Sequence, residues 1–276
     1  MRNKFKKLID NPLVVLTYIR TQFWWRVIAE SKSRQYARFH FLSGKETIAA
    51  ITTTDRSIIR AGDGTFGYLL GSSIYFNNWQ FIYNRNFAKK LERVLRDGQD
   101  SNILFCYPHT YIRKSKAEFA AEGIRSEWPI WITGKVLLQK FLRLDRMYGD
   151  AVCFHPKLNP NIDFVGIKKY LDTKHIVIIT SNIERFADIR LGLSTTLIPG
   201  PSSDAWRVYE ELEAQALAVV AEKGFAPTEV LFMISAAEAA KVMVYDLTKA
   251  GYTAWDTGQF FDMAAKEISA LQSQPI

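Results

Sequence analysis

The sequence has little cysteine, glycine or proline, and each shortage excludes a class of protein. Two cysteines in 276 residues are too few for a disulfide framework or a cysteine-based zinc site. Cys106 and Cys153 both stand among apolar neighbours, as small core residues do, and fit a reduced, cytoplasmic compartment. Fifteen glycines and nine prolines exclude collagen-like and low-complexity architectures. With 48% hydrophobic residues, the chain can bury one large core or two small ones.

The sequence also lacks the signals of several common function classes. Its four histidines are His40, His109, His155 and His175. No two of them have the i, i+4 spacing of a helical metal site, so a histidine-based metal centre is not expected. No G-x-S-x-G motif is present, which argues against an α/β-hydrolase. The longest uncharged run, residues 64–84, is interrupted by glycine, serine and asparagine, so it does not predict a membrane span.

Positive charge is concentrated in the first 40 residues. Nine basic and two acidic residues there give +7, whereas the other 236 residues carry 27 basic and 26 acidic residues, or +1. A nucleic-acid binder usually carries its basic residues on the working face of the fold, so no nucleic-acid partner is expected. Arg20 and Arg26 interrupt the apolar stretch, and no small-residue cleavage site follows, which argues against a signal peptide.

The same basic segment predicts a helix that begins near Pro12. Apolar residues recur there at helical spacing: Leu16, Ile19, Phe23 and Val27. Two interpretations remain open. The helix either packs on the domain or in a homodimer interface, or it lies on an anionic membrane surface through the aromatic and basic residues of 1–40.

From about residue 57, apolar runs of strand length alternate with helical segments. The uninterrupted runs 176–179 and 230–234 indicate strands that are buried on both faces. The alternation predicts an α/β fold, with a Rossmann-like, doubly wound, mostly parallel sheet that carries helices on both faces. The expected strands are Ser57–Ala61, Asn102–Cys106, Ala151–Phe154, His175–Thr180, Thr195–Ile198, Val230–Ile234 and Tyr252–Asp256. The expected helices are Asn86–Arg96, Gly134–Arg146, Ile162–Leu171, Ser203–Lys223 and Ala237–Ala250.

A glycine-rich turn follows the first expected strand and formally reads G-x-G-x-x-G over residues 62–67. The acid that a dinucleotide site needs about 20 residues later is missing, as are the further motifs of a protein kinase. Gly62 and Gly64 would let the backbone approach a ligand closely. Asp63 would repel a bare diphosphate, but a divalent cation could bridge its carboxylate to phosphates. Alternatively, Asp63 only caps the helix that follows. Arg60 would pair with a phosphate or hold Asp63.

Further candidate residues stand at the carboxyl ends of later strands. These ends are where α/β sheets bind ligands. Ser235 directly follows the expected strand 230–234, and the helix after it offers N–H groups and a positive dipole end to an anion. Lys241 in that helix would either add charge to this site or lie in solvent. Asp256 ends the last expected strand, where a functional acid is expected. Asp204 is either a first-turn acid or a substrate contact.

Two of these segments resemble motifs of the GT-D type glycosyltransferases. Residues 60–66, Arg-Ala-Gly-Asp-Gly-Thr-Phe, are similar to the family motif R-F-G-D-G-E-F. Residues 240–258 are similar to a longer motif, A-K-V-L-A-Y-D-L-x-K-x-G-Y-x-A-x-D-I-G. Arg185 and Asp204 stand in weaker echoes of other family motifs. The resemblance runs from about Ser57 to Asp262.

The resemblance implies a bacterial enzyme that uses a nucleotide sugar. It divides the chain into a basic, aromatic helical extension (1–50) and a Rossmann-like glycosyltransferase domain (51–276). The expected reaction moves a sugar from a nucleoside diphosphate, with UDP favoured, to a glycan, lipid-linked or protein acceptor in the synthesis of surface polysaccharide or glycoprotein. The enzyme would work in the cytoplasm, where residues 1–40 would bind the inner face of the cell membrane.

The resemblance also assigns roles. Asp63 would contact the metal, Mn²⁺ or Mg²⁺, or the donor sugar, and Asp256, or else Asp204 or Asp262, would be the base. The expected nucleotide-binding residues are Arg60, Gly62, Gly64, Thr65, Arg185, Asp204, Ser235 and Lys241. Their cations would neutralise the diphosphate leaving group.

Two departures from the family pattern leave other functions open. Thr65 replaces the second carboxylate of the family's D-x-E, and Glu238 stands in the family's Gly-Pro-Thr turn. A hydroxyl is a poor replacement for a charged ligand of a hard cation. The main alternative is a catalytically silent subunit that binds a glycan or a partner glycosyltransferase. A nucleotide-binding enzyme of another kind rests on fold analogy alone.

Overall fold

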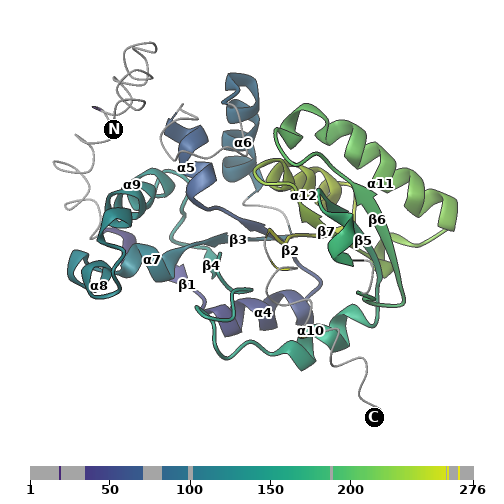
Figure 1. Cartoon of the computed structure of the whole chain (residues 1–276), viewed down its shortest axis with the longest axis horizontal. Coiled ribbons are helices and arrows are strands. Elements are labelled where there is room, and N and C mark those ends of the chain that lie inside the picture. Colours follow the sequence, from purple (N-terminus) through teal and green to yellow (C-terminus); the bar gives the residue numbers. More distant parts are fainter. Residues whose placement is uncertain are drawn as a thin grey trace.

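The computed structural model describes residues 35–70, 83–98, 102–186 and 189–258, together with residues 19, 260 and 267 (Figure 1). Its centre is one eight-stranded sheet with the order β1-β4-β3-β2-β8-β7-β5-β6. Every strand pair is parallel, so the predicted α/β fold is confirmed. The strands are β1 (His40–Phe41), β2 (Ser57–Arg60), β3 (Ile103–Tyr107), β4 (Met147–Asp150), β5 (His175–Thr180), β6 (Ser194–Pro199), β7 (Val230–Ser235) and β8 (Thr253–Asp256).

Helices cover both faces of this sheet. In Figure 1, α4 and α10 lie on one side, and α5, α6, α9, α11 and α12 lie on the other. The longer helices are α4 (Gly44–Thr53), α5 (Asp63–Leu70), α6 (Arg85–Asp97), α9 (Trp128–Leu138), α10 (Phe164–Leu171), α11 (Tyr209–Lys223) and α12 (Ala239–Lys249). Shorter helical segments are α7 (His109–Arg113), α8 (Lys116–Ala121), η3 (Arg125–Glu127), η4 (Ile183–Phe186), η5 (Ala205–Arg207) and η6 (Pro227–Glu229).

The two helical layers enclose two hydrophobic cores. Successive residues of a strand point to opposite faces, so Ile58 packs in one core and Ile59 in the other. The same alternation divides β7, where Phe232 faces the side of α12 and Met233 faces the side of α10. A strand buried on both sides needs apolar residues at every position. This explains the continuous apolar runs in β5 and β7.

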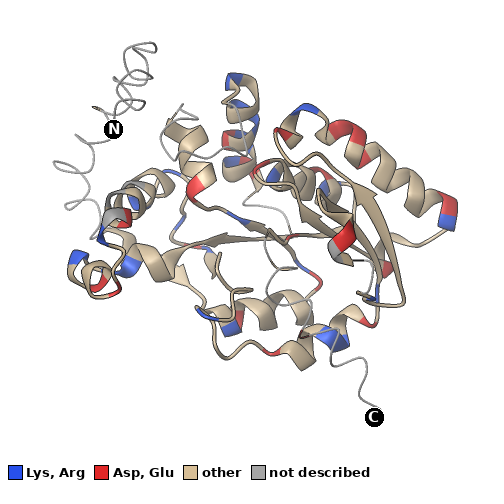
Figure 2. Ribbon diagram, viewed as in Figure 1, with Lys and Arg blue, Asp and Glu red and all other residues tan. Residues whose placement is uncertain are grey.

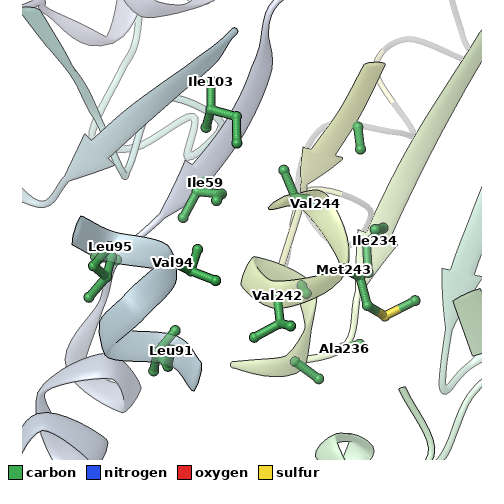
Figure 3. Close-up of a cluster of buried hydrophobic side chains, with 14 of the residues drawn as sticks. Ile59, Leu91, Val94, Leu95, Ile103, Ile234, Ala236, Val242, Met243 and Val244 are labelled. Carbon is green, nitrogen blue, oxygen red and sulfur yellow. The ribbon is translucent and has the colours of Figure 1, made fainter. Parts of the chain in front are cut away.

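The core beneath α6 and α12 fixes the elements that hold the candidate site. Asn84 caps α6 by accepting a hydrogen bond from the Phe87 N–H at 2.9 Å. The apolar stripe of α6 faces α12, with Leu91 and Val94 near Val242 (Figure 3). Each such fully buried side chain stabilises the fold by about 1.5–3 kcal/mol. The start of α12 is therefore held firmly against the sheet.

Several predicted boundaries are wrong. The apolar run 151–154 is a turn after β4, and its residues serve the core rather than a strand. The helix expected at 134–146 is α9, which begins at Trp128 and ends at Leu138. Its Gly134 packs on Phe66, where an added Cβ would stand 2.1 Å from the ring. The segment expected as one helix from Ser203 to Lys223 splits into η5 and α11.

Other features were not predicted or lie outside the described residues. β1, α4, α7 and α8 had no expected counterpart. Both β1, which pairs with β4, and α4, which packs on α10, belong to the sheet and its layers. The expected N-terminal helix falls in residues 1–34, of which only residue 19 is described. The proposed boundary at residue 50 therefore stays a prediction.

Lysine, arginine, aspartate and glutamate intermingle on the helices that surround the sheet (Figure 2). Within the described ranges, each helix is too short or too polar to cross a bilayer.

Candidate functional site

The candidate site lies where the carboxyl ends of β2, β8 and β7 meet. All strands are parallel, so these three neighbours end at one edge of the sheet. From β2 the chain continues outward through β3 and β4, whereas β8 and β7 lead toward β5 and β6 on the other side. Such a reversal of strand order opens a crevice in which α/β proteins bind ligands. Arg60, Ser235, Lys241 and Asp256, predicted separately from the sequence, all lie at this point.

Arg60 ties the ends of two other strands together. Its Nε donates to the Asp256 carbonyl at 2.7 Å, and its Nη1 donates to the Ala151 carbonyl at 3.1 Å. The guanidinium also lies over the Phe154 ring, 5.5 Å from the centroid. These contacts differ from the expected pairing with Asp63. The planar guanidinium is instead held in one position by two carbonyl oxygens.

Lys241 is buried between two carboxylates. It is 4% exposed, and its Nζ lies 3.2 Å from Glu238 Oε1 and 3.3 Å from Asp256 Oδ2. Asp256 Oδ2 also accepts the Arg60 backbone N–H at 3.1 Å. Burial acts to lower the pKa of Lys241, but the two carboxylates outweigh it and leave the pKa raised. Lys241 therefore stays charged inside the protein rather than lying in solvent.

Glu238 joins the start of α12 to the glycine-rich turn. Thr65 Oγ1 donates to Glu238 Oε2 at 2.8 Å, and the Gly62 N–H donates to Thr65 Oγ1 at 3.2 Å. An added Cβ on Gly64 would stand 2.6 Å from Glu238 Oε1, so glycine is what fits there. Burial raises the pKa of Glu238, while Lys241 and the hydrogen bond from Thr65 act in the opposite direction. We call Arg60, Thr65, Glu238, Lys241 and Asp256 the charged cluster.

Asp63 stands apart from this cluster. It is the first residue of α5, its side chain is exposed, and its Oδ1 accepts the Gly64 N–H at 2.9 Å. The nearby Thr65 hydroxyl is already donated to Glu238. Within the described residues, no group of three or more His, Cys, Asp or Glu side chains could hold a metal ion. In the glycine-rich turn, residues 62–67, Asp63 supplies the one carboxylate.

The end of β7 is closed by local hydrogen bonds. Ser235 Oγ donates to the Gly258 carbonyl at 2.8 Å, which ties β7 to the turn after β8. Gly258 has φ +49°, and a Cβ there would lie 2.1 Å from Arg60 Nη2. The N–H groups of residues 239–241 donate to the carbonyls of residues 236–238 at 3.1–3.3 Å. These first amides of α12 therefore already have partners, unlike the free N–H groups expected from the sequence.

The other predicted residues are not brought into the cluster by any described contact. Asp204 has φ +51°, and its Oδ1 accepts the Trp206 Nε1–H at 3.3 Å. Arg185 belongs to η4, and its side chain lies outside the described part, as does Asp262. Their expected roles stay predictions.

A second polar group was missed by the sequence reasoning. His109 begins α7 two residues beyond the end of β3, and Asp150 is the last residue of β4, so both lie at the same edge as the charged cluster. His109 Nδ1 lies 3.7 Å from Asp150 Oδ2. For His109 the available signal was position, two residues beyond the end of β3. Asp150 gave no such signal, because the strand expected at 151–154 placed it at a strand's amino end, whereas it ends β4. His109 was weighed only as a metal ligand.

The charged cluster can stabilise an anion. It contains one buried cation, Lys241, and one half-buried cation, Arg60, and with both carboxylates ionised the four charged side chains balance. The glycine-rich turn beside it allows a ligand close to the backbone. An incoming polyanion would compete with Glu238 for Lys241. The exposed Asp63 adds negative charge that an arriving cation could balance.

Comparisons with known proteins agree with this architecture. The family described as glycosyltransferase GT-D fold matches residues 58–266. A search of curated proteins finds no match. Among solved structures, one described as the highly conserved domain of unknown function 1792 with a distinct glycosyltransferase fold shares 19% identity, with a TM-score of 0.69 over 88% of this chain and 86% of that one. A selenomethionine-substituted structure of the same kind of domain shares 20% identity, with a TM-score of 0.68 and the same coverage. A structure described as a new glycosyltransferase from Streptococcus sanguinis shares 20% identity, with a TM-score of 0.60 over 85% of each chain.

Proposed function

Because the chain belongs to the glycosyltransferase GT-D fold family, we propose that it transfers a sugar from a nucleoside diphosphate, with UDP as the nucleotide, to a hydroxyl-bearing acceptor. The observation that carries the proposal is a pair of fixed cations, the half-buried Arg60 and the buried Lys241, beside a glycine-rich turn at the reversal of strand order. Departure of a nucleoside diphosphate from a sugar builds negative charge on the phosphate oxygens. Fixed cations in a water-poor site stabilise such charge strongly.

The rigidity of Arg60 supports this role. Two carbonyl oxygens fix its guanidinium before any ligand arrives. A preorganised cation does not have to move as charge develops on the leaving group, so the reaction avoids the free-energy cost of reorganising the site. Asp256 holds both cations through its side chain and backbone, which favours a positioning role for this residue.

The residues near Asp63 fit a divalent cation that is shared with the donor. Mg²⁺ and similar ions commonly take one or two carboxylates, with substrate phosphates and water completing their ligands. Asp63 would supply the carboxylate, and the bound cation would neutralise phosphate charge. Thr65 is not available as a second ligand in the described arrangement, because its side chain is fully buried and its hydroxyl both accepts the Gly62 N–H and donates to Glu238.

The acceptor and the cellular setting extend the proposal. A glycan, lipid-linked or protein acceptor in surface polysaccharide or glycoprotein synthesis fits a bacterial enzyme of this family. We propose that the basic residues 1–40 bring the enzyme to the cytoplasmic face of the membrane or join two copies of the chain. The silent-subunit alternative is favoured by one observation, the mutual neutralisation of the four charged side chains without a ligand.

Release of UDP from a panel of UDP-sugars tests the proposed function. We expect the wild-type protein to release UDP from at least one sugar in the panel. Arg60→Met should lower the rate about 100-fold, the cost of losing one preorganised donor to a developing anion. Arg96→Met, which changes an exposed arginine of α6, should leave the rate unchanged. If UDP binds but no UDP-sugar is cleaved, the silent-subunit alternative is supported instead.

A further inference from the structure

The second polar group at this edge is built around a buried carboxylate. Asp150 is 3% exposed, and its side chain accepts hydrogen bonds from the Thr110 hydroxyl and from the Val152 N–H. Its backbone N–H donates to Thr47 Oγ1 at 2.9 Å. The carboxylate is thus held by contacts from α7 and the turn after β4, and the backbone of Asp150 is held by α4. Its Oδ2 faces the ring of His109.

His109 is fixed in front of this carboxylate by aromatic stacking. Its ring stacks on Phe41 at a centroid distance of 5.2 Å, and Phe41 stacks on Tyr36 at 4.7 Å. His109 is 6% exposed, and its Nδ1 is buried without a hydrogen bond. The Tyr36 hydroxyl is also buried without a partner. A buried polar atom without a partner costs free energy, so packing alone does not account for these two.

The charge state of the ring follows from its surroundings. Burial lowers the pKa of His109, the Asp150 carboxylate acts to raise it, and the Arg113 guanidinium acts to lower it further. Asp150 also raises the pKa of other groups around it, the phenols of Tyr36 and Tyr111 and the thiols of Cys106 and Cys153. A neutral imidazole can take up a proton. At 3.7 Å, Asp150 would stabilise the imidazolium that results.

The pair lies next to the charged cluster. Arg60 Nη1 donates to the carbonyl of Ala151, the residue that follows Asp150. The Arg60 guanidinium therefore joins the charged cluster to the backbone that directly follows Asp150. Asp256, the expected base, is 3% exposed and engaged with both Lys241 and the Arg60 N–H. A carboxylate used in this way is poorly placed to accept a proton from an acceptor.

We infer that His109 is the general base of the proposed reaction and that Asp150 is the positioning residue that orients it. The inference rests on the proposed function. The acceptor O–H bond breaks and its proton passes to His109 Nε2, because Nδ1 faces Asp150. A bond forms between the acceptor oxygen and the anomeric carbon. The bond from that carbon to the phosphate oxygen breaks, and its electron pair leaves with the nucleoside diphosphate.

The pH dependence of UDP-sugar hydrolysis tests this inference, with water as the acceptor. The probe is whichever of UDP-glucose, UDP-galactose and UDP-N-acetylglucosamine the wild-type protein hydrolyses fastest. His109→Gln should lower kcat by about 100-fold and remove the acidic limb of the pH profile, while UDP affinity stays unchanged. Asp150→Asn removes the charge that raises the pKa of His109, so the acidic limb should move to lower pH. His40→Gln, which changes an exposed histidine of β1, is the control.

The variants test the assignment of His109 as base, whereas the wild-type protein tests the proposed function. A wild-type kcat in His109→Gln overturns the inference, and so does a lowered kcat that keeps the acidic limb, because either result makes His109 a packing residue. If His109→Gln does not fold, an unmoved acidic limb in Asp150→Asn overturns the inference on its own. If the wild-type protein hydrolyses none of the three donors, the proposed function itself fails and the base assignment fails with it.

Discussion

Replacing Lys241 with methionine should lower the free energy of unfolding by about 3–5 kcal/mol, the usual cost of breaking a buried ion pair by removing one partner. Methionine fills similar space but leaves Glu238 and Asp256 facing each other without their shared cation. Both carboxylates are buried, so water cannot replace the lost ammonium. Urea unfolding followed by circular dichroism measures the change.

A matched lysine on the same helix provides the control. Lys249 is exposed at the end of α12, and Lys249→Met should change stability little. Combining Lys241→Met with Glu238→Gln should recover part of the loss, because one of the two stranded carboxylates is then neutral. A loss below about 1 kcal/mol in Lys241→Met, the range of exposed ion pairs, would contradict the buried ionic cluster.

Replacing Glu238 with glutamine should strengthen UDP binding on the order of tenfold, equivalent to about 1.4 kcal/mol. Glutamine has nearly the same shape, can still accept the hydrogen bond from Thr65, and removes a negative charge from the edge where a diphosphate is expected. Lys241 keeps its pairing with Asp256 and becomes free of its second carboxylate. Calorimetric titration of UDP into both proteins measures the change.

The control for this prediction is Glu222→Gln, which alters net charge equally on the exposed surface of α11. Its UDP affinity should match that of the wild-type protein. If Glu238→Gln binds UDP more weakly than wild type does, Glu238 takes part in holding the nucleotide. Its competition with the diphosphate for Lys241 would then be refuted.

Strands buried on both faces were the most predictable part of the fold. β5 and β7 need apolar residues at every position, so their runs stand out from the sequence. β4 was misplaced because the apolar residues 151–154 fill a core from a turn, and burial alone does not distinguish the two. β1 has two residues and depends on pairing with β4, a contact over a hundred positions away in sequence.

The candidate site was predictable in its members but not in its contacts. Arg60, Lys241 and Asp256 each stand at or just beyond a strand end, and a parallel sheet brings such positions together. The partners of each side chain depend on distances of a few ångströms across the edge. Thr65 and Glu238 illustrate this, since their hydrogen bond joins residues 173 positions apart. Asp63, which was expected to contact the metal or the donor sugar, stands outside the charged cluster.

Calorimetric titration of UDP, with Mn²⁺ and then with EDTA, tests the central claim most directly. We expect the wild-type protein to bind UDP with Mn²⁺ present, and both EDTA and Asp63→Asn to weaken binding at least about tenfold. Asp145→Asn, which changes an exposed aspartate just before β4 at the opposite edge of the sheet, should bind as wild type does. Absence of UDP binding by the wild-type protein under both conditions would contradict a nucleotide-sugar site at the charged cluster.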